Sequence, residues 1–96
     1  MAAAAYNFAM AMVMVVDDTA VIREAVARLL RREGFETICA ANGKEALDKL
    51  KLNQPDLVLL DIMMPEMDGL HCLQELRSDP RWETLPVIMM TALCDD

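Results

Sequence analysis

The sequence predicts an α/β fold in which helices cover both faces of a doubly wound parallel sheet. Two observations favour this fold. Short apolar runs alternate along the chain with amphipathic stretches of helical period. The runs at 12–16 and 57–60 are apolar at every position, which is typical of strands buried on both faces. The 96 residues, of which 55% are hydrophobic, are enough for one domain with a core and exclude a disordered chain.

The first half of the chain begins with a strand over residues 12–16 that ends at Asp17 and Asp18. A helix follows, because apolar residues recur at helical spacing through 21–30, and Gly34 marks its end. Its apolar face is formed by Val21, Ile22, Ala25, Val26, Leu29 and Leu30. The opposite, charged face is formed by Arg23, Glu24, Arg28, Arg31 and Arg32. Residues 36–39 give a weaker, shorter strand.

The second half opens with a helix cap, since Asn42 lies three residues before Glu45. The elements predicted after it are a helix ending before Pro55, a strand over 56–60 that ends at Asp61, a helix marked by Leu70, Leu73 and Leu76, and a strand over 86–90. Strands and helices therefore alternate from one end of the domain to the other, as parallel sheets require.

Composition excludes several classes of partner. The formal net charge of −7 would repel nucleic acid and anionic lipid. The longest uninterrupted apolar run, residues 8–16, is too short to span a membrane, and no basic residue precedes it as in a secretory signal. We interpret residues 1–11 as an N-terminal extension and 12–96 as the domain. Three separated cysteines indicate reduced thiols in the cytoplasm.

Carboxylates follow two of the predicted strands. Asp17 and Asp18 end the first strand, and Asp61 ends the third. The carboxyl ends of parallel strands meet at one edge of a sheet, so these side chains converge if the two strands are neighbours. Repulsion would then raise the pKa of one carboxyl unless a cation lay among them. A hard divalent cation that takes oxygen ligands, Mg²⁺ above all, fits such a cluster.

Plainer roles stay open for each of these positions. Asp18 or Thr19 could cap the helix that follows the first strand. Asp68 lies in a turn signal and is expected to act as a turn or cap residue. Thr91, at the end of the last strand, could donate a hydrogen bond to an oxyanion beside Asp61, although threonine is also an ordinary strand residue.

Three motifs, taken together and in this order, resemble the receiver domain of two-component response regulators. They are Val15-Val16-Asp17-Asp18, then Asp61-Ile62-Met63-Met64-Pro65-Glu66-Met67-Asp68-Gly69, then Met89-Met90-Thr91-Ala92. The resemblance runs from Met12 to the end of the chain. It implies a flavodoxin-like fold with strand order 2-1-3-4, because the usual fifth strand has no counterpart in these residues.

The resemblance also implies a function in two-component signalling. It makes the domain a phosphoacceptor that assists its own phosphorylation rather than an enzyme. Asp61 would accept a phosphoryl group in Mg²⁺-dependent transfer from a sensor histidine kinase or a histidine phosphotransfer domain. Asp18, Asp61 and the backbone carbonyl of Met63 would bind Mg²⁺ directly, Asp17 would act largely through water, and Thr91 would supply the switch hydroxyl.

The family pattern continues beyond the strand that ends at Thr91 and Ala92, whereas this sequence stops at Asp96. Receivers continue through a helix, a fifth strand with a site lysine and an aromatic switch residue, and a final helix, and these have no counterpart here. The alternatives are a truncated or non-phosphorylated receiver-like interaction module and, less favoured, a flavodoxin-like ligand-binding domain. Asp17-Asp18-Thr19 would repel the phosphate that such a domain holds after its first strand. An aspartate-nucleophile phosphatase would want an acid at position 63, where Met stands.

The absent fifth strand has a consequence for assembly. The strand over 87–90 would be left as an apolar edge with unpaired backbone groups. We therefore expect this chain to associate with itself through that fourth strand.

Overall fold

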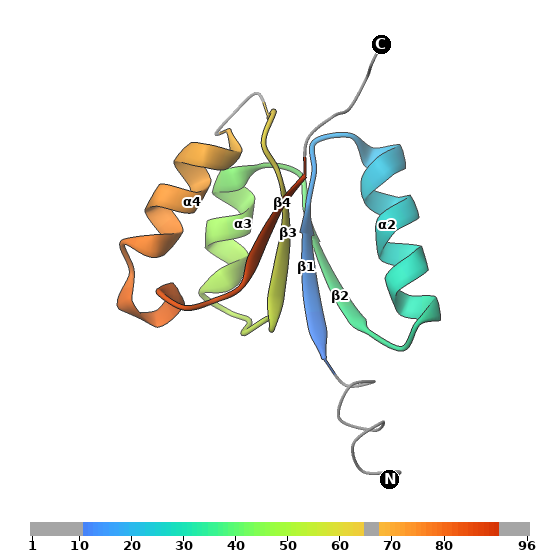
Figure 1. Ribbon diagram of the computed structural model, residues 1–96. Helices are drawn as coiled ribbons and strands as arrows, with labels where there is room; N and C mark the ends of the chain where they lie inside the picture. Colours follow the sequence, from blue (N-terminus) through green and yellow to red (C-terminus); the bar gives the residue numbers. More distant parts are fainter. Residues whose placement is uncertain (1–10, 65–67, 91–96) are drawn as a thin grey trace, which may run out of the picture.

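The computed structural model describes residues 11–64 and 68–90 (Figure 1). Strands and helices alternate along this part of the chain in the predicted order. The elements are β1 (Met12–Val16), α2 (Ala20–Arg32), β2 (Glu36–Ala40), α3 (Gly43–Leu50), β3 (Leu57–Asp61), α4 (Gly69–Arg77), the short 3-10 helix η1 (Pro80–Trp82) and β4 (Val87–Met90). The sequence patterns did not predict η1, which is a single turn between α4 and β4.

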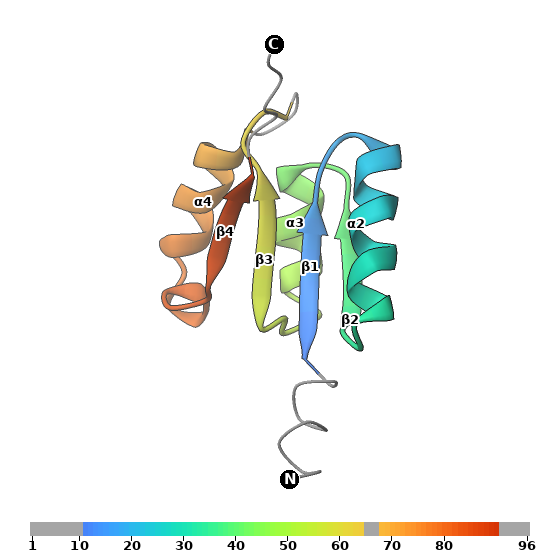
Figure 2. The ribbon, with the colours of Figure 1, turned by 45° about the vertical axis from the view of Figure 1, so that its right-hand side comes forward.

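All four strands of the sheet are parallel and lie in the order β2-β1-β3-β4, as the family resemblance implied (Figure 2). The central strand β1 pairs with β2 on one side and β3 on the other, so that Val15 lies opposite both Cys39 and Leu59. Because the strands share one direction, their carboxyl ends all meet at the same edge of the sheet.

The main core lies between the sheet and the pair α3 and α4. Side chains of β1 and β3 meet residues of both helices and of η1 there, including Met14, Leu60, Leu50, Leu76 and Trp82. Figure 1 shows α2 alone on the opposite face. Among the described helices, α2 is therefore the one element that covers that face, and its contacts are with β1 and β2.

Burial along the helices differs in part from the pattern in the sequence. Within α2, Ala27 is buried, whereas Val21 and Leu29 of the apolar stripe are 79% and 57% exposed. In α4, Cys72 and Leu76 are buried while Leu70 is 59% exposed. Periodicity located both helices correctly but did not show how much of each apolar face the sheet would cover.

The caps predicted for α3 and α4 are present. Asn42 accepts a hydrogen bond from the backbone N–H of Glu45 at 2.8 Å, and the Glu45 carboxylate accepts one from the N–H of Ala41. Asp68 caps α4 by accepting from the N–H of His71 at 2.8 Å. Gly34, just beyond α2, has a φ of 100°, which is the left-handed conformation that a glycine at a helix end supplies.

Candidate functional site

Three carboxylates meet at the carboxyl ends of β1 and β3. Val16 lies opposite Leu60 in the sheet, so that Asp17 and Asp61 leave neighbouring strands side by side. One oxygen each from Asp17, Asp18 and Asp61 lies within 4.8 Å of the other two. The convergence that the sequence predicted is confirmed. We call this group of three side chains the acidic cluster.

A shallow pocket of about 380 Å³ opens at the acidic cluster. It is lined by Asp17, Asp18, Thr19, Ile22, Asp61, Met63 and Met90. None of these described lining residues is basic. Thr91, the expected switch residue, follows Met90 in the sequence and lies outside the described residues.

Asp17 organises the loop between β1 and α2. Its side chain is buried, with 5% of the residue exposed, and its carboxylate accepts a hydrogen bond from the N–H of Thr19 at 2.9 Å. Its own N–H donates to the carbonyl of Ala40 at 3.1 Å, which ties the loop to the end of β2. Thr19 is the N-cap residue of α2 but makes no side-chain cap bond. The carboxylate that holds the start of α2 is thus that of Asp17, and not a side chain at 18 or 19.

Arg23 was placed wrongly from the sequence. It was expected on the charged outer face of the helix, but it is half-buried, and its guanidinium donates to the backbone carbonyl of Asp17 at 2.6 Å. Arg23 lies in the first turn of α2, so its long side chain reaches back to the loop that precedes the helix. Its spacing of six residues from Asp17 was the available signal for this contact.

Asp61 is held in a less polar environment than an ordinary carboxylate. Only 8% of the residue is exposed, and burial raises its pKa, with the charges of Asp17 and Asp18 acting in the same direction. A hydrogen bond from the N–H of Met63, at 3.2 Å, opposes the rise. The sequence predicted a raised pKa from repulsion alone, whereas burial is the larger cause.

The chain after Asp61 is folded back tightly by a glycine. Gly69 donates its N–H to the carbonyl of Ile62 at 2.8 Å. A Cβ at position 69 would clash with the backbone oxygen of Asp61 and would lie 2.6 Å from the Cα of Ile62. Both neighbours are backbone atoms, so there is no room for a larger residue. The sequence marked Gly69 as a turn residue but did not reveal this close approach.

The donor set suits a hard divalent cation. Three carboxylates offer oxygen ligands to one point, and the pocket leaves space for bound water. A cation there would offset the mutual repulsion of the cluster and the rise in the pKa of Asp61. The residues therefore fit Mg²⁺, the ion predicted from the sequence.

Comparison with known proteins gives one consistent result. The family model described as response regulator receiver domain matches residues 13–96. The response regulator Rre1 of Synechocystis sp. is 46% identical over 80 residues, which cover 82% of this chain and 35% of that protein. The chain thus spans about a third of the length of the curated relatives it matches.

Solved structures match the fold as well as the sequence. The N-terminal domain of a response regulator receiver protein from Methanoculleus marisnigri superimposes with a TM-score of 0.83 at 41% identity, over 88% of this chain and 69% of that one. Response regulator protein TrrA from Thermotoga maritima, in complex with Mg(2+)-BeF, gives a TM-score of 0.80 at 41% identity, over 86% of this chain and 70% of that one.

Proposed function

Because the chain belongs to the response regulator receiver domain family, we propose that Asp61 accepts a phosphoryl group in Mg²⁺-dependent transfer from a histidine kinase or a histidine phosphotransfer domain. The domain is a signalling phosphoacceptor rather than an enzyme of the ordinary kind. The observation that carries the proposal is the convergence of Asp17, Asp18 and Asp61 at the carboxyl ends of two adjacent strands.

Each residue of the acidic cluster has a separate role in this proposal. Asp61 is the nucleophile, and the hydrogen bond from Met63 N–H fixes the rotation of its carboxylate. Asp18 and Asp61 bind Mg²⁺ directly together with the backbone carbonyl of Met63, and Asp17 acts largely through water. The buried, hydrogen-bonded position of Asp17 supports that indirect role, because one of its oxygens is already engaged by Thr19.

Magnesium supplies charge neutralisation when it is bound. It offsets the repulsion between the acidic cluster and an anionic phosphodonor and shields the oxygens of the transferred group. The TrrA complex with Mg(2+)-BeF supports this part of the proposal. Thr91 as the switch hydroxyl remains a proposal, supported by the position of the preceding residue, Met90, in the lining of the pocket.

Two further parts of the function are proposed with it. A cytoplasmic location is proposed on the basis of the family. Separately, within the described residues no helix has the length and apolar character needed to cross a membrane. We also propose that this chain associates with itself through β4. The described part of the sheet ends at that strand.

The phosphoacceptor is tested by incubation with acetyl phosphate and Mg²⁺ followed by intact mass measurement. We expect one phosphoryl group per chain. Asp61→Asn should abolish the modification. The control Asp68→Asn should keep it, because Asp68 caps α4 and is not part of the acidic cluster. Modification that survives Asp61→Asn would overturn the assignment.

Binding of Mg²⁺ at the acidic cluster is tested separately from phosphorylation of Asp61. Titration with Mg²⁺ should move the amide resonances of Asp17, Asp18 and Asp61 while leaving those around Trp82, at the other end of the sheet, unchanged. Ca²⁺ should compete for the same resonances, since it prefers the same oxygen ligands. The absence of any localised change at saturating Mg²⁺ would rule the site out.

A further inference from the structure

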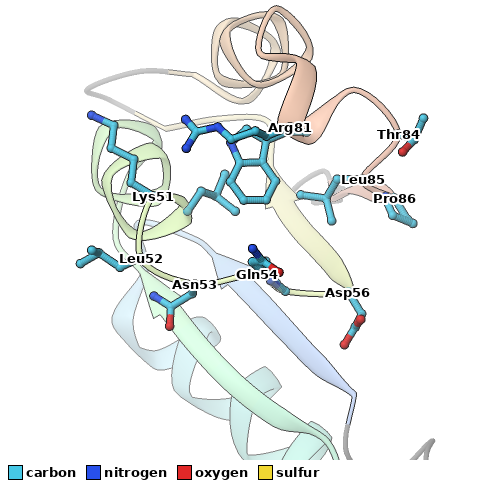
Figure 3. Close-up of a pocket in the computed structure, with 12 residues that line it drawn as sticks. Lys51, Leu52, Asn53, Gln54, Asp56, Arg81, Thr84, Leu85 and Pro86 are labelled. Carbon is cyan, nitrogen blue, oxygen red and sulfur yellow. The ribbon is translucent and has the colours of Figure 1, made fainter.

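A second pocket opens at the amino ends of the strands, which is the opposite end of the sheet from the acidic cluster. Its volume is about 620 Å³, within the range of cavities that hold ligands. Figure 3 shows Lys51, Leu52 and Asn53 of the α3–β3 loop on one side and Leu85 and Pro86 on the other. We call this the amino-end pocket.

The wall of the amino-end pocket combines apolar side chains with polar and charged ones, which are Lys51, Asn53, Gln54, Asp56, Arg81 and Thr84. Trp82 and Leu85 line it and are each 9% exposed, and the lining residue Pro55 is buried. Leu52 lies at its edge and is 85% exposed, the largest exposure among the large apolar side chains of the described residues. The guanidinium of Arg81 lies 5.5 Å from the centroid of the Trp82 ring and is held by Asp79. An aromatic side chain in the pocket would therefore meet apolar groups with polar groups beside them.

The chain enters the sheet directly beside this pocket. Met12 donates its N–H to the carboxylate of Asp56 at 2.8 Å, and Asp56 donates its own N–H back to the carbonyl of Met12 at 2.8 Å. Asp56 is itself a lining residue of the amino-end pocket. Any segment that precedes Ala11 therefore starts within about one strand spacing, roughly 5 Å, of the pocket.

The ten residues before Ala11 have the composition to fill it. Residues 1–10 carry no charged side chain and include two aromatic residues, Tyr6 and Phe8. In an extended segment, side chains two apart point the same way. At about 3.3 Å per residue, Phe8 can reach roughly 10 Å from Ala11 and Tyr6 roughly 17 Å.

We propose that the N-terminal segment, residues 1–10, docks in the amino-end pocket of its own chain, with Tyr6 and Phe8 against Trp82, Leu52 and Leu85. Aromatic side chains gain most from burial against other aromatic and aliphatic groups. The short tether to Met12 keeps the entropic cost of docking in the same chain small. This inference does not depend on phosphorylation, because the pocket lies away from the acidic cluster.

The chain carries two fluorescent side chains that can be used to test whether the N-terminal segment docks. Tyr6 is its single tyrosine and Trp82 its single tryptophan, so energy transfer from one to the other reports their separation. In the full chain we expect a tyrosine band in the excitation spectrum of Trp82 emission. Leu52→Asp should remove most of that band. Leu29→Asp is the matched control, since Leu29 is also more than half exposed but lies on α2, and it should keep the band.

A second pair of variants tests the segment itself. Phe8→Ala should weaken the transfer, whereas Asn7→Ala, which changes the residue between the two aromatics, should keep it. Circular dichroism checks that each variant remains folded. Transfer that is unchanged in both Leu52→Asp and Phe8→Ala would overturn the proposal. Transfer that is lost on dilution would overturn it too, because it would place the segment of a second copy in the pocket.

Discussion

Asp61, the proposed phosphoacceptor, lowers the stability of the folded domain when its carboxyl group is ionised. Burial raises its pKa above the ordinary value of 3.8, and the neighbouring carboxylates add to the rise. An acid whose pKa is higher in the folded state than in the unfolded state opposes folding when it is ionised. That penalty is complete above the folded-state pKa, shrinks as the pH falls through it, and vanishes below the unfolded value. The cost is thus present at neutral pH, where the proposed cation would relieve it.

Asp61→Asn should therefore stabilise the domain at pH 7 in the absence of Mg²⁺, because it removes a buried charge. The gain in melting temperature should shrink as the pH is lowered through the pKa of Asp61. Saturating Mg²⁺ should reverse the order of the two proteins, since an ion at one hundred times its Kd adds about 2.7 kcal/mol to the protein that binds it. Thermal melts at several pH values, with and without Mg²⁺, measure all three effects. A gain that is equal at every pH would contradict this account of Asp61.

Gly69 is the residue whose replacement should disturb the site without touching a carboxylate. In Gly69→Ala the new methyl group would press on the backbone of Asp61 and Ile62, which cannot move without shifting the acidic cluster. We expect a loss of about 1–3 kcal/mol in the free energy of unfolding, together with weaker Mg²⁺ binding. Urea denaturation measures the first and an amide-shift titration the second. Leu70→Ala, an exposed neighbour, is the control and should change neither by much.

Among the elements, those with strong local signals could be predicted from the sequence. Continuous apolar runs located β1 and β3, and the carboxylates after them located the acidic cluster. Asn42 and Glu45 marked the start of α3 because a capping box is formed by residues close in sequence. The role of Arg23 was missed because its contact with the Asp17 carbonyl depends on how α2 sits on the sheet. The close approach of Gly69 to Asp61 is likewise a property of the folded backbone, which a turn signal does not convey.

Helix capping offers a matched pair of substitutions. Asn42 accepts a hydrogen bond from the N–H of Glu45, whereas Thr19, the equivalent residue of α2, makes no side-chain cap bond. Asn42→Ala should therefore cost about 1 kcal/mol in the free energy of unfolding, and Thr19→Ala much less. Both losses of unfolding free energy are measured by urea denaturation without Mg²⁺, so that metal binding at the nearby acidic cluster does not contribute. Equal costs for the two variants would show that the cap bond contributes nothing.

At the scale of the whole molecule, the two faces of the sheet are covered unequally. α3, α4 and η1 pack on one face, while on the other α2 contacts β1 and β2. The side chain of Ile88 in β4 is 53% exposed. Ile88 is thus an exposed apolar side chain on the outermost strand of the described sheet, and exposed apolar groups that gather on one surface are typical of protein interfaces.

The backbone of β4 strengthens this argument. The carbonyl groups of Pro86, just before β4, and of Met90 accept hydrogen bonds from the N–H groups of Val58 in β3 and of Ile62, the residue after β3. Because backbone groups alternate in direction along a strand, those of Val87 and Met89 point away from β3. Within the described residues β3 is the sole strand paired with β4, so these groups are open to another strand. Natural edge strands avoid such pairing by carrying charge, and this one has none between 87 and 90.

We therefore predict that the chain associates through β4 and that Ile88→Lys prevents it. A lysine on the exposed edge strand would have to be buried at the junction of two sheets, at a cost in free energy that outweighs a few backbone hydrogen bonds. Light scattering over a concentration series should show the average mass of the unaltered chain rising towards that of a dimer or larger assembly, and the mass of Ile88→Lys staying constant. Leu70→Lys is the control: Leu70 is 59% exposed on α4, away from β4, so its replacement should leave association intact. A chain that stays monomeric throughout, with a cooperative melt at high concentration, would mean that its β4 edge is already covered.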